Sequence, residues 1–254
     1  MESIQQTPQA PEAGPAGTLS LAGRFVAVFA RPTQAWVGLD RRGQWWFPLL
    51  LSVLVAVVGT ALTYERAMVP TILAQMEAKV ETGEVPAQAL DRIEAQVSGP
   101  VAKVVQVGSL VVVLPLVTLA VALIPWIAAG FMLGRRFRFR DAFAVTCWAG
   151  LVALPNQILT SILAWTNESM RNLHTGFGVL LPVEDPPSKL MVGLGSFLDN
   201  GIGPLTLWYV AVLGLGTAAL SGAPRRPAML AVGGLWLAGA AIFSVVGGFL
   251  APGA

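Results

Sequence analysis

A 30-residue stretch without a charged side chain, Val104–Leu133, constrains this chain more than any other feature. A helix needs only roughly 20 apolar residues to cross the hydrocarbon core of a bilayer. Four arginines follow within the six positions 135–140, and a second apolar run extends from Ala142 to Trp165. The two runs predict a pair of membrane-spanning helices joined by a short basic turn, residues 134–141, which we call the arginine elbow.

The composition agrees with a membrane protein. Of the 254 residues, 55% are apolar and only 12% are charged, against about 25% charged in soluble domains. The fold class predicted is an all-α integral membrane protein with five transmembrane helices. The spans are expected at about residues 45–64, 104–133, 142–165, 204–220 and 228–250.

The segments outside the spans differ in character. Residues 1–17 are predicted to be a disordered tail, because they lack both an apolar run and the basic start of a signal peptide. Residues 18–250 are expected to form a single membrane domain. Its first part, residues 18–39, is amphipathic and fits either an interfacial helix or a helix packed on the protein's own spans, with Arg24 and Arg31 off the apolar face.

Two longer connections follow the first and third spans. Residues 65–103 carry two amphipathic helical patterns with acidic residues on the solvated side, which predicts a helical extracytoplasmic loop. Residues 166–203 are read as a polar connection without clear periodicity. Small residues repeat every four positions in the last two spans, for example at Ala240, Ser244 and Gly248, and predict close helix packing.

Basic residues indicate the orientation of the chain. Ten of them lie in the N-terminal region, the arginine elbow and the short connection containing Arg225 and Arg226. Cytoplasmic loops carry an excess of Lys and Arg. We therefore expect the N-terminus in the cytoplasm and the C-terminus outside. The preference for arginine over lysine, with abundant Ala, Gly and Val, favours a bacterial cytoplasmic membrane.

The arginine elbow has three interpretations. It is a topogenic signal, it can hold anionic lipid headgroups, and the aromatic rings between its arginines can form a docking edge for a partner protein. The residues of this candidate docking site are Arg135, Arg136, Phe137, Arg138, Phe139 and Arg140.

A second candidate site is the polar kink Pro155, Asn156 and Gln157 within the third span. Pro155 frees a backbone carbonyl, so the two amides either line a small polar cavity or make interhelical hydrogen bonds that hold the kink. The second alternative is favoured.

Sequence patterns for catalysis or metal binding are weak. The only histidine, His174, is expected to be an ordinary loop residue although Glu168 and Ser169 are close in sequence. Glu77 and Glu81 share a helix face and are expected to be solvated. The single cysteine excludes a disulfide framework, and the net charge of +2 is too small to indicate nucleic acid. No catalytic residue, metal site or cofactor is predicted.

The order of these features resembles the Yip family of five-span membrane proteins, named for interaction with Ypt/Rab GTPases, and especially its bacterial members. The similarity lies in short segments from about Leu19 to Leu250: Phe29–Pro32, Trp45–Pro48, Val85–Leu90, the elbow leading into Ala149–Pro155, Gly203–Trp208, and Leu235–Trp236. Leu205 stands where the family usually has Phe. The resemblance implies a five-helix adaptor or assembly partner and supplies no catalytic residue.

Two functions follow as hypotheses. The first is a non-enzymatic membrane adaptor or scaffold whose partners are other membrane proteins and anionic lipids. The alternative is a small-solute or lipid transporter, or a subunit of one, for which the polar kink would line the path.

Overall fold

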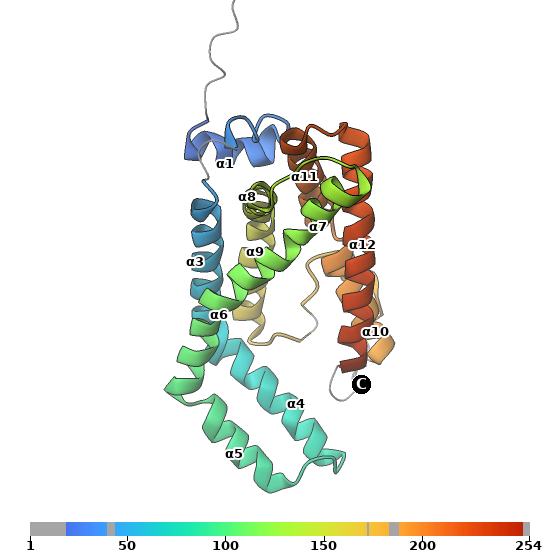
Figure 1. Ribbon diagram of the computed structural model, residues 1–254. Coiled ribbons are helices and arrows are strands. Elements are labelled where there is room, and N and C mark those ends of the chain that lie inside the picture. The colour runs from blue at the N-terminus through green and yellow to red at the C-terminus, as the bar shows by residue number, and fades with distance from the viewer. Residues whose placement is uncertain (1–18, 40–43, 172, 183–187, 251–254) are drawn as a thin grey trace, which may run out of the picture.

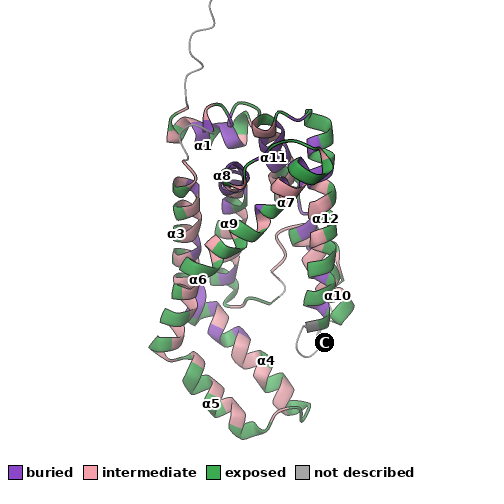
Figure 2. Cartoon of the chain, viewed as in Figure 1, coloured by how far each residue is buried: buried purple, intermediate pink, exposed green. Residues whose placement is uncertain are grey.

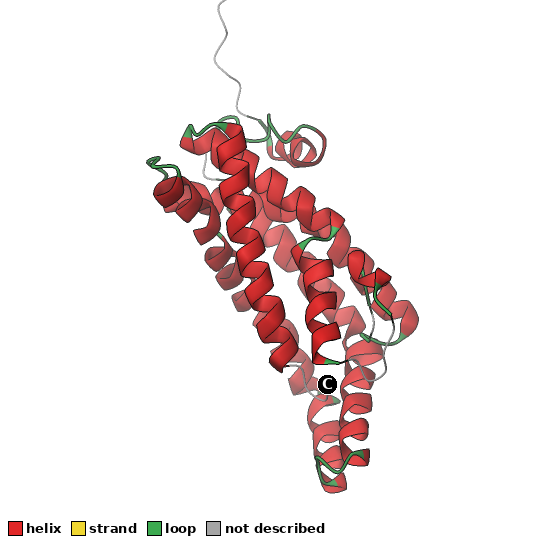
Figure 3. Cartoon of the chain, turned by 90° about the vertical axis from the view of Figure 1, so that its right-hand side faces the viewer, coloured by secondary structure: helices red, strands yellow, loops and turns green. Residues whose placement is uncertain are grey.

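The computed structural model describes residues 19–39, 44–171, 173–182 and 188–250, and every regular element in these ranges is helical (Figures 1 and 3). Five helical segments are long and apolar enough to cross a membrane, namely Trp46–Glu81, Pro100–Met132, Phe139–Asn167, Pro204–Ser221 and Arg225–Phe249. The prediction of an all-α protein with five spans is confirmed. The predicted tail, residues 1–17, lies outside the described residues.

The elements follow one another with short breaks. In chain order they are α1 (Leu21–Ala30), α3 (Trp46–Thr63), η1 (Tyr64–Met68), α4 (Val69–Glu81), α5 (Ala87–Val97), α6 (Pro100–Val121), α7 (Leu123–Ile127), η2 (Ala128–Met132), α8 (Phe139–Gly150), η3 (Leu151–Ala153), α9 (Leu154–Asn167), η4 (Phe177–Leu180), α10 (Lys189–Ser196), η5 (Phe197–Gly201), α11 (Pro204–Ser221) and α12 (Arg225–Leu250). The elements η1, η2 and η5 are π-helical turns, and η3 and η4 are 3₁₀ turns.

The two ends of the bundle are different. The arginine elbow and the start of α12 lie at the same end of the bundle as α1, and we call this the arginine end (Figure 1). At the other end α4 and α5 form an antiparallel helical hairpin that projects away from the spans, and we call this the hairpin end (Figures 1 and 3). The acidic residues of this hairpin, Glu77 and Glu81 among them, are exposed as expected.

The first connection is continuous with the first span. We expected that span to end near Tyr64, but the helix runs through the π-turn η1 into α4 without a break. Tyr64 is buried, and its hydroxyl donates a hydrogen bond to the carbonyl oxygen of Val97 at 2.9 Å. This contact joins η1, which leads into α4, to the end of α5.

The helix α1 lies across the arginine end of the bundle, roughly perpendicular to α3 (Figure 1). Its buried residues Ala27 and Val28 join the main core cluster, and α1 packs against α8 and η3. The expectation that Arg24 lies off the packed face was wrong. Arg24 is fully buried, and its guanidinium donates to the carbonyl oxygens of Ala35 and, at 3.0 Å, Val37, because the chain after α1 folds back over it.

The core lies in the arginine half of the bundle. Trp148 of α8 is fully buried, with Phe47 of α3 at a ring distance of 5.9 Å and the Arg24 guanidinium 5.6 Å from its ring. Outward-facing side chains on α6 and α12 are apolar and exposed (Figure 2). Such surfaces are normal for helices whose solvent is lipid.

Candidate functional site

The fourth span, Pro204–Ser221, lies close to the bounds expected for it, but a further helical segment precedes it and the two together form a broken helix. Residues 166–203, expected to be an irregular polar connection, contain α10 and η5, which pack along the C-terminal half of α12, while α11 packs along its N-terminal half. The chain between η5 and α11 is non-helical at Ile202 and Gly203. A break between two helical segments exposes backbone groups that must be satisfied by protein or by a polar cavity.

Close approach holds α10 against α12. A Cβ on Gly193 would lie 3.0 Å from the carbonyl oxygen of Ser244, and one on Gly248 would lie 2.6 Å from that of Lys189. The predicted small-residue stripe of the last span therefore does mediate close helix packing, and its partner is the half-helix that the sequence did not reveal.

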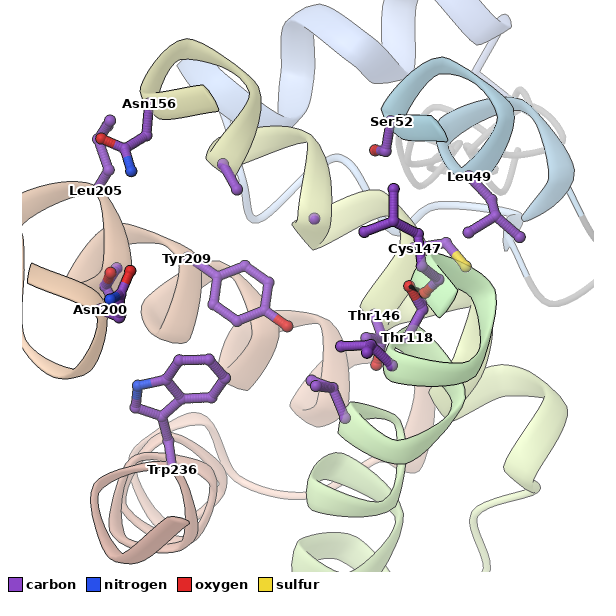
Figure 4. A pocket seen from close by; sticks show the side chains of 16 residues that line it. Leu49, Ser52, Thr118, Thr146, Cys147, Asn156, Asn200, Leu205, Tyr209 and Trp236 are labelled. Carbon is purple, nitrogen blue, oxygen red and sulfur yellow. Dashed lines mark hydrogen bonds between the residues drawn. The ribbon is translucent and has the colours of Figure 1, made fainter. Parts of the chain in front are cut away.

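A cavity of about 330 Å³ lies beside the broken helix (Figure 4). Residues from α3, α6, α8, η3, α9, η5, α11 and α12 line it, and Thr118, Asn156 and Trp236 each come from near the middle of their spans. Its lining, all of it within the described part of the chain, contains no Asp, Glu, Lys, Arg or His. The polar residues of the lining are Ser52, Thr118, Thr146, Asn156, Asn200, Thr206 and Tyr209.

Some of these polar groups are already satisfied. The hydroxyls of Thr118 and Thr146 donate to the carbonyl oxygens four residues earlier, at 2.8 and 2.9 Å. The indole of Trp236 donates to the carbonyl oxygen of Gly201 at 3.0 Å, which satisfies one backbone group at the break. These residues shape the wall of the cavity and offer it no free N–H or O–H group.

Other polar groups of the lining are available. Within the described part of the chain, the hydroxyl of Tyr209 and the side-chain amide of Asn156 form no hydrogen bond, and neither do the side chains of Ser52 and Asn200. Figure 4 shows the Tyr209 hydroxyl pointing into the space toward Thr118 and Thr146, with its ring beside Trp236 at 5.2 Å. A polar group left unpaired at this depth costs free energy, so the cavity is suited to a molecule that supplies the missing hydrogen bonds.

Next to the break, the carboxylate of Asp199 binds groups from a preceding loop, and we call this set of contacts the carboxylate clamp. One Asp199 oxygen accepts hydrogen bonds from the backbone N–H groups of Gly176 and Gly178, each at 2.9 Å, and the other contacts His174 Nδ1 at 2.6 Å. A Cβ on Gly178 would lie 2.5 Å from both Asp199 and His174. The clamp fixes the loop before η4 onto the end of η5.

The clamp gives His174 a partner that sequence proximity did not suggest. Glu168, the neighbour considered in the sequence, instead pairs with Arg66 at 2.8 Å. Asp199 was missed because it lies 25 residues further along the chain. The only available signal was the run of glycines on either side, at positions 176 and 178 and at 201 and 203, which leaves room for tight contacts.

Of the three residues of the predicted polar kink, only Asn156 lines the cavity. Pro155 lies in the first turn of α9, after the 3₁₀ turn η3, and is exposed. Neither Asn156 nor Gln157 donates a side-chain hydrogen bond to another helix within the described residues. The geometry therefore favours the cavity over the interhelical hydrogen bonds.

The side chains of the arginine elbow differ in exposure. Its arginines are exposed at the arginine end, and Arg138 pairs with Asp141 at 2.9 Å. Phe137, in contrast, is buried, and Phe139 packs edge-on against Trp126 at 6.3 Å. The docking site stays a prediction, but its exposed surface consists of the arginines and not of the two rings.

The described residues contain no group of three or more His, Cys, Asp or Glu side chains placed to hold an ion. Cys147, which borders the cavity, is buried in α8. The arrangement can therefore bind through hydrogen bonds and apolar contact.

Comparison with known proteins gives one result. No curated protein and no solved structure matches the chain significantly. The Yip1 domain, in contrast, matches residues 26–246, which include four spans, all but the end of the fifth, the arginine elbow and the residues that line the cavity. A match over most of the chain, together with five apolar helices in this order, shows that the chain belongs to the Yip1 domain family of membrane proteins.

Proposed function

We propose that this protein is a non-enzymatic membrane adaptor or scaffold that holds other membrane proteins together. Its N-terminus faces the cytoplasm and its exposed elbow arginines lie against anionic headgroups on that side. Support comes from the family, from the distribution of arginines, and above all from the helix α6.

The carrying observation is that no residue of α6, all of which the structure describes, is buried. This helix packs against α3 on one side, while Val105, Val112 and Leu119 on the other side are 64%, 61% and 38% exposed. Transmembrane helices associate where small residues permit close approach. A Cβ added to Gly108, which lies on the same face, would meet nothing within 4 Å, so the face has room for a partner helix.

The α4–α5 hairpin supports the same function. Its helices pack on each other and on the bases of their own spans, and its acidic side chains are exposed. It adds an ordered surface beyond the membrane without contributing to the main core.

Site-specific photo-crosslinking in native membranes tests the proposal. A photoreactive amino acid is placed in turn at Val105, Val112 and Leu119 on α6, and at Leu230 and Leu237 on α12 as a control with the same seven-residue spacing. Leu230 and Leu237 are also exposed. We expect one specific protein adduct from the α6 positions and none from α12. Adducts with lipid alone from both helices would overturn the adaptor proposal.

The transporter is a second candidate, and the cavity at the broken helix favours it. Flux of neutral solutes or lipid into proteoliposomes provides the test, with Asn156→Leu as the variant in the cavity. Gln157→Leu is the matched control, because Gln157 does not line the cavity. Flux that falls with Asn156→Leu alone supports the second candidate, whereas flux indistinguishable from empty liposomes eliminates it.

A further inference from the structure

The cavity has a mouth at the apolar surface of the bundle. Two of its lining residues, Val117 on α6 and Leu205 on α11, are 50% and 36% exposed. The helix α6 packs against α3, α7 and α8, while α11 packs against α8 and α12. The space between α6 and α11 is therefore bordered by exposed apolar side chains.

The lining restricts the charge of the occupant. All of the lining residues are uncharged, so an anionic or cationic group placed there would have no counter-charge at membrane depth. The walls supplied by Leu49, Leu114, Val117, Val121 and Leu205 suit a hydrocarbon chain. The unpaired hydroxyl of Tyr209 and amide of Asn156 suit a hydroxyl or ester group, each of which accepts or donates hydrogen bonds.

The size of the cavity fits the same class of molecule. Small-molecule sites have volumes of roughly 300–1,000 Å³, and this cavity has about 330 Å³. It accommodates the polar end of a lipid and the start of a chain, with the rest of the molecule in the bilayer.

We propose that this cavity binds an uncharged glycerolipid, such as a diacylglycerol, whose hydroxyl and ester groups pair with Tyr209 and Asn156. The molecule reaches the site sideways, between α6 and α11. This inference stands apart from the adaptor proposal, because a bound lipid can regulate a scaffold as readily as it can be the cargo of a transporter.

The test uses the purified full-length protein in nanodiscs with a photoactivatable diacylglycerol. Adducts are mapped by peptide mass spectrometry, and unlabelled diacylglycerol is added as competitor. We expect saturable labelling of peptides from α6, α9 and α11 that line the cavity. A photoactivatable phosphatidylglycerol with the same chains is the second arm, and we expect it to label the outward faces of the spans without saturation.

Three variants make the outcome specific. Tyr209→Phe removes only a hydroxyl and is expected to weaken competition about 2- to 10-fold, corresponding to one hydrogen bond. Ala153→Phe places a large ring at a lining residue and is expected to abolish saturable labelling. Ala241→Phe, at an exposed position of α12 outside the lining, is the control and is expected to change nothing.

Two results would overturn the inference. One is saturable labelling of the cavity peptides by both lipids alike, since a site without cationic groups should distinguish them. The other is labelling by diacylglycerol that is unchanged in both Tyr209→Phe and Ala153→Phe. Because no partner protein is present, failure of the adaptor proposal leaves this readout unaffected.

Discussion

The helices on either side of the arginine elbow are both able to cross a membrane, but they are held in different ways. In the arm before the elbow, α6 to η2, only 6% of the most apolar stretch is buried inside the protein, against 56% in the arm after it, α8 to α9. The exposed arm is also the more apolar of the two by mean hydropathy. Within a bilayer, apolar surface gains little from leaving lipid, so small residues that permit close packing determine which helix becomes central.

The residues of the two arms show this difference. The buried face of α8 contains Ala142, Ala144 and Ala149 around Trp148, whereas the outward positions of α6 are mostly valine and leucine. Packing energy should therefore be concentrated in the second arm. Three substitutions test this difference, the first two with matched controls.

The largest effect is expected from Trp148→Ala. Its side chain is fully buried among Phe47, Arg24 and the core of the arginine half, and removing a buried large aromatic costs about 3–5 kcal/mol. Leu116→Ala in α6 is the control, because Leu116 is 58% exposed. Thermal unfolding in nanodiscs should show a large decrease in Tm for the first variant and a small one for the second. Equal decreases would mean that both arms carry similar packing energy.

A smaller effect is expected from Gly216→Ala in α11. The new Cβ would lie 2.6 Å from Val145 and 2.9 Å from the Trp36 ring, and overpacking of this kind costs about 1–3 kcal/mol. Gly108→Ala in α6 is the matched control, since nothing lies within 4 Å of its added Cβ. Unfolding by denaturant should separate the two variants, and a neutral Gly216→Ala would show that the core around α1 can adjust.

The smallest effect is expected from Lys103→Ala at the base of α6. Lys103 pairs with Glu65 at 2.7 Å, but the Glu65 side chain is 73% exposed, and exposed ion pairs contribute about 0–1 kcal/mol. The difference in stability from the original protein should shrink further at high salt. A loss of several kcal/mol would instead make this pair the main anchor of α6, and the first arm would then be held by charge.

The spans were predictable because their signal is local. A long uncharged stretch and a basic flank are properties of consecutive residues, and so is the presence of two amphipathic helices in the first connection. The half-helix at residues 189–201 was not predictable, because it is short, carries three glycines and Asp199, and depends on close contact with Ser244 and Gly248. Its position depends on residues some 50 places away.

The candidate site was predictable only where one residue carries a local signal. Asn156 follows a proline inside an apolar run, so it was recognised. Tyr209 and Trp236 look like ordinary aromatic residues of two spans, and only the packing of α11 on α12 brings them together beside the cavity. The burial of Arg24 was also not predictable, because the helical pattern of α1 does not show that the turn after it covers the guanidinium.

The tip of the α4–α5 hairpin has a practical consequence. Gly83 adopts a φ of +74°, and an added Cβ there would meet nothing within 4 Å. Exposed tips of this kind are the sites where chains accept insertions most readily. The chain can therefore be lengthened at this point without disturbing the spans. An epitope tag placed there would show on which side of the membrane the hairpin lies, because an antibody reaches it on intact cells only if the hairpin is outside.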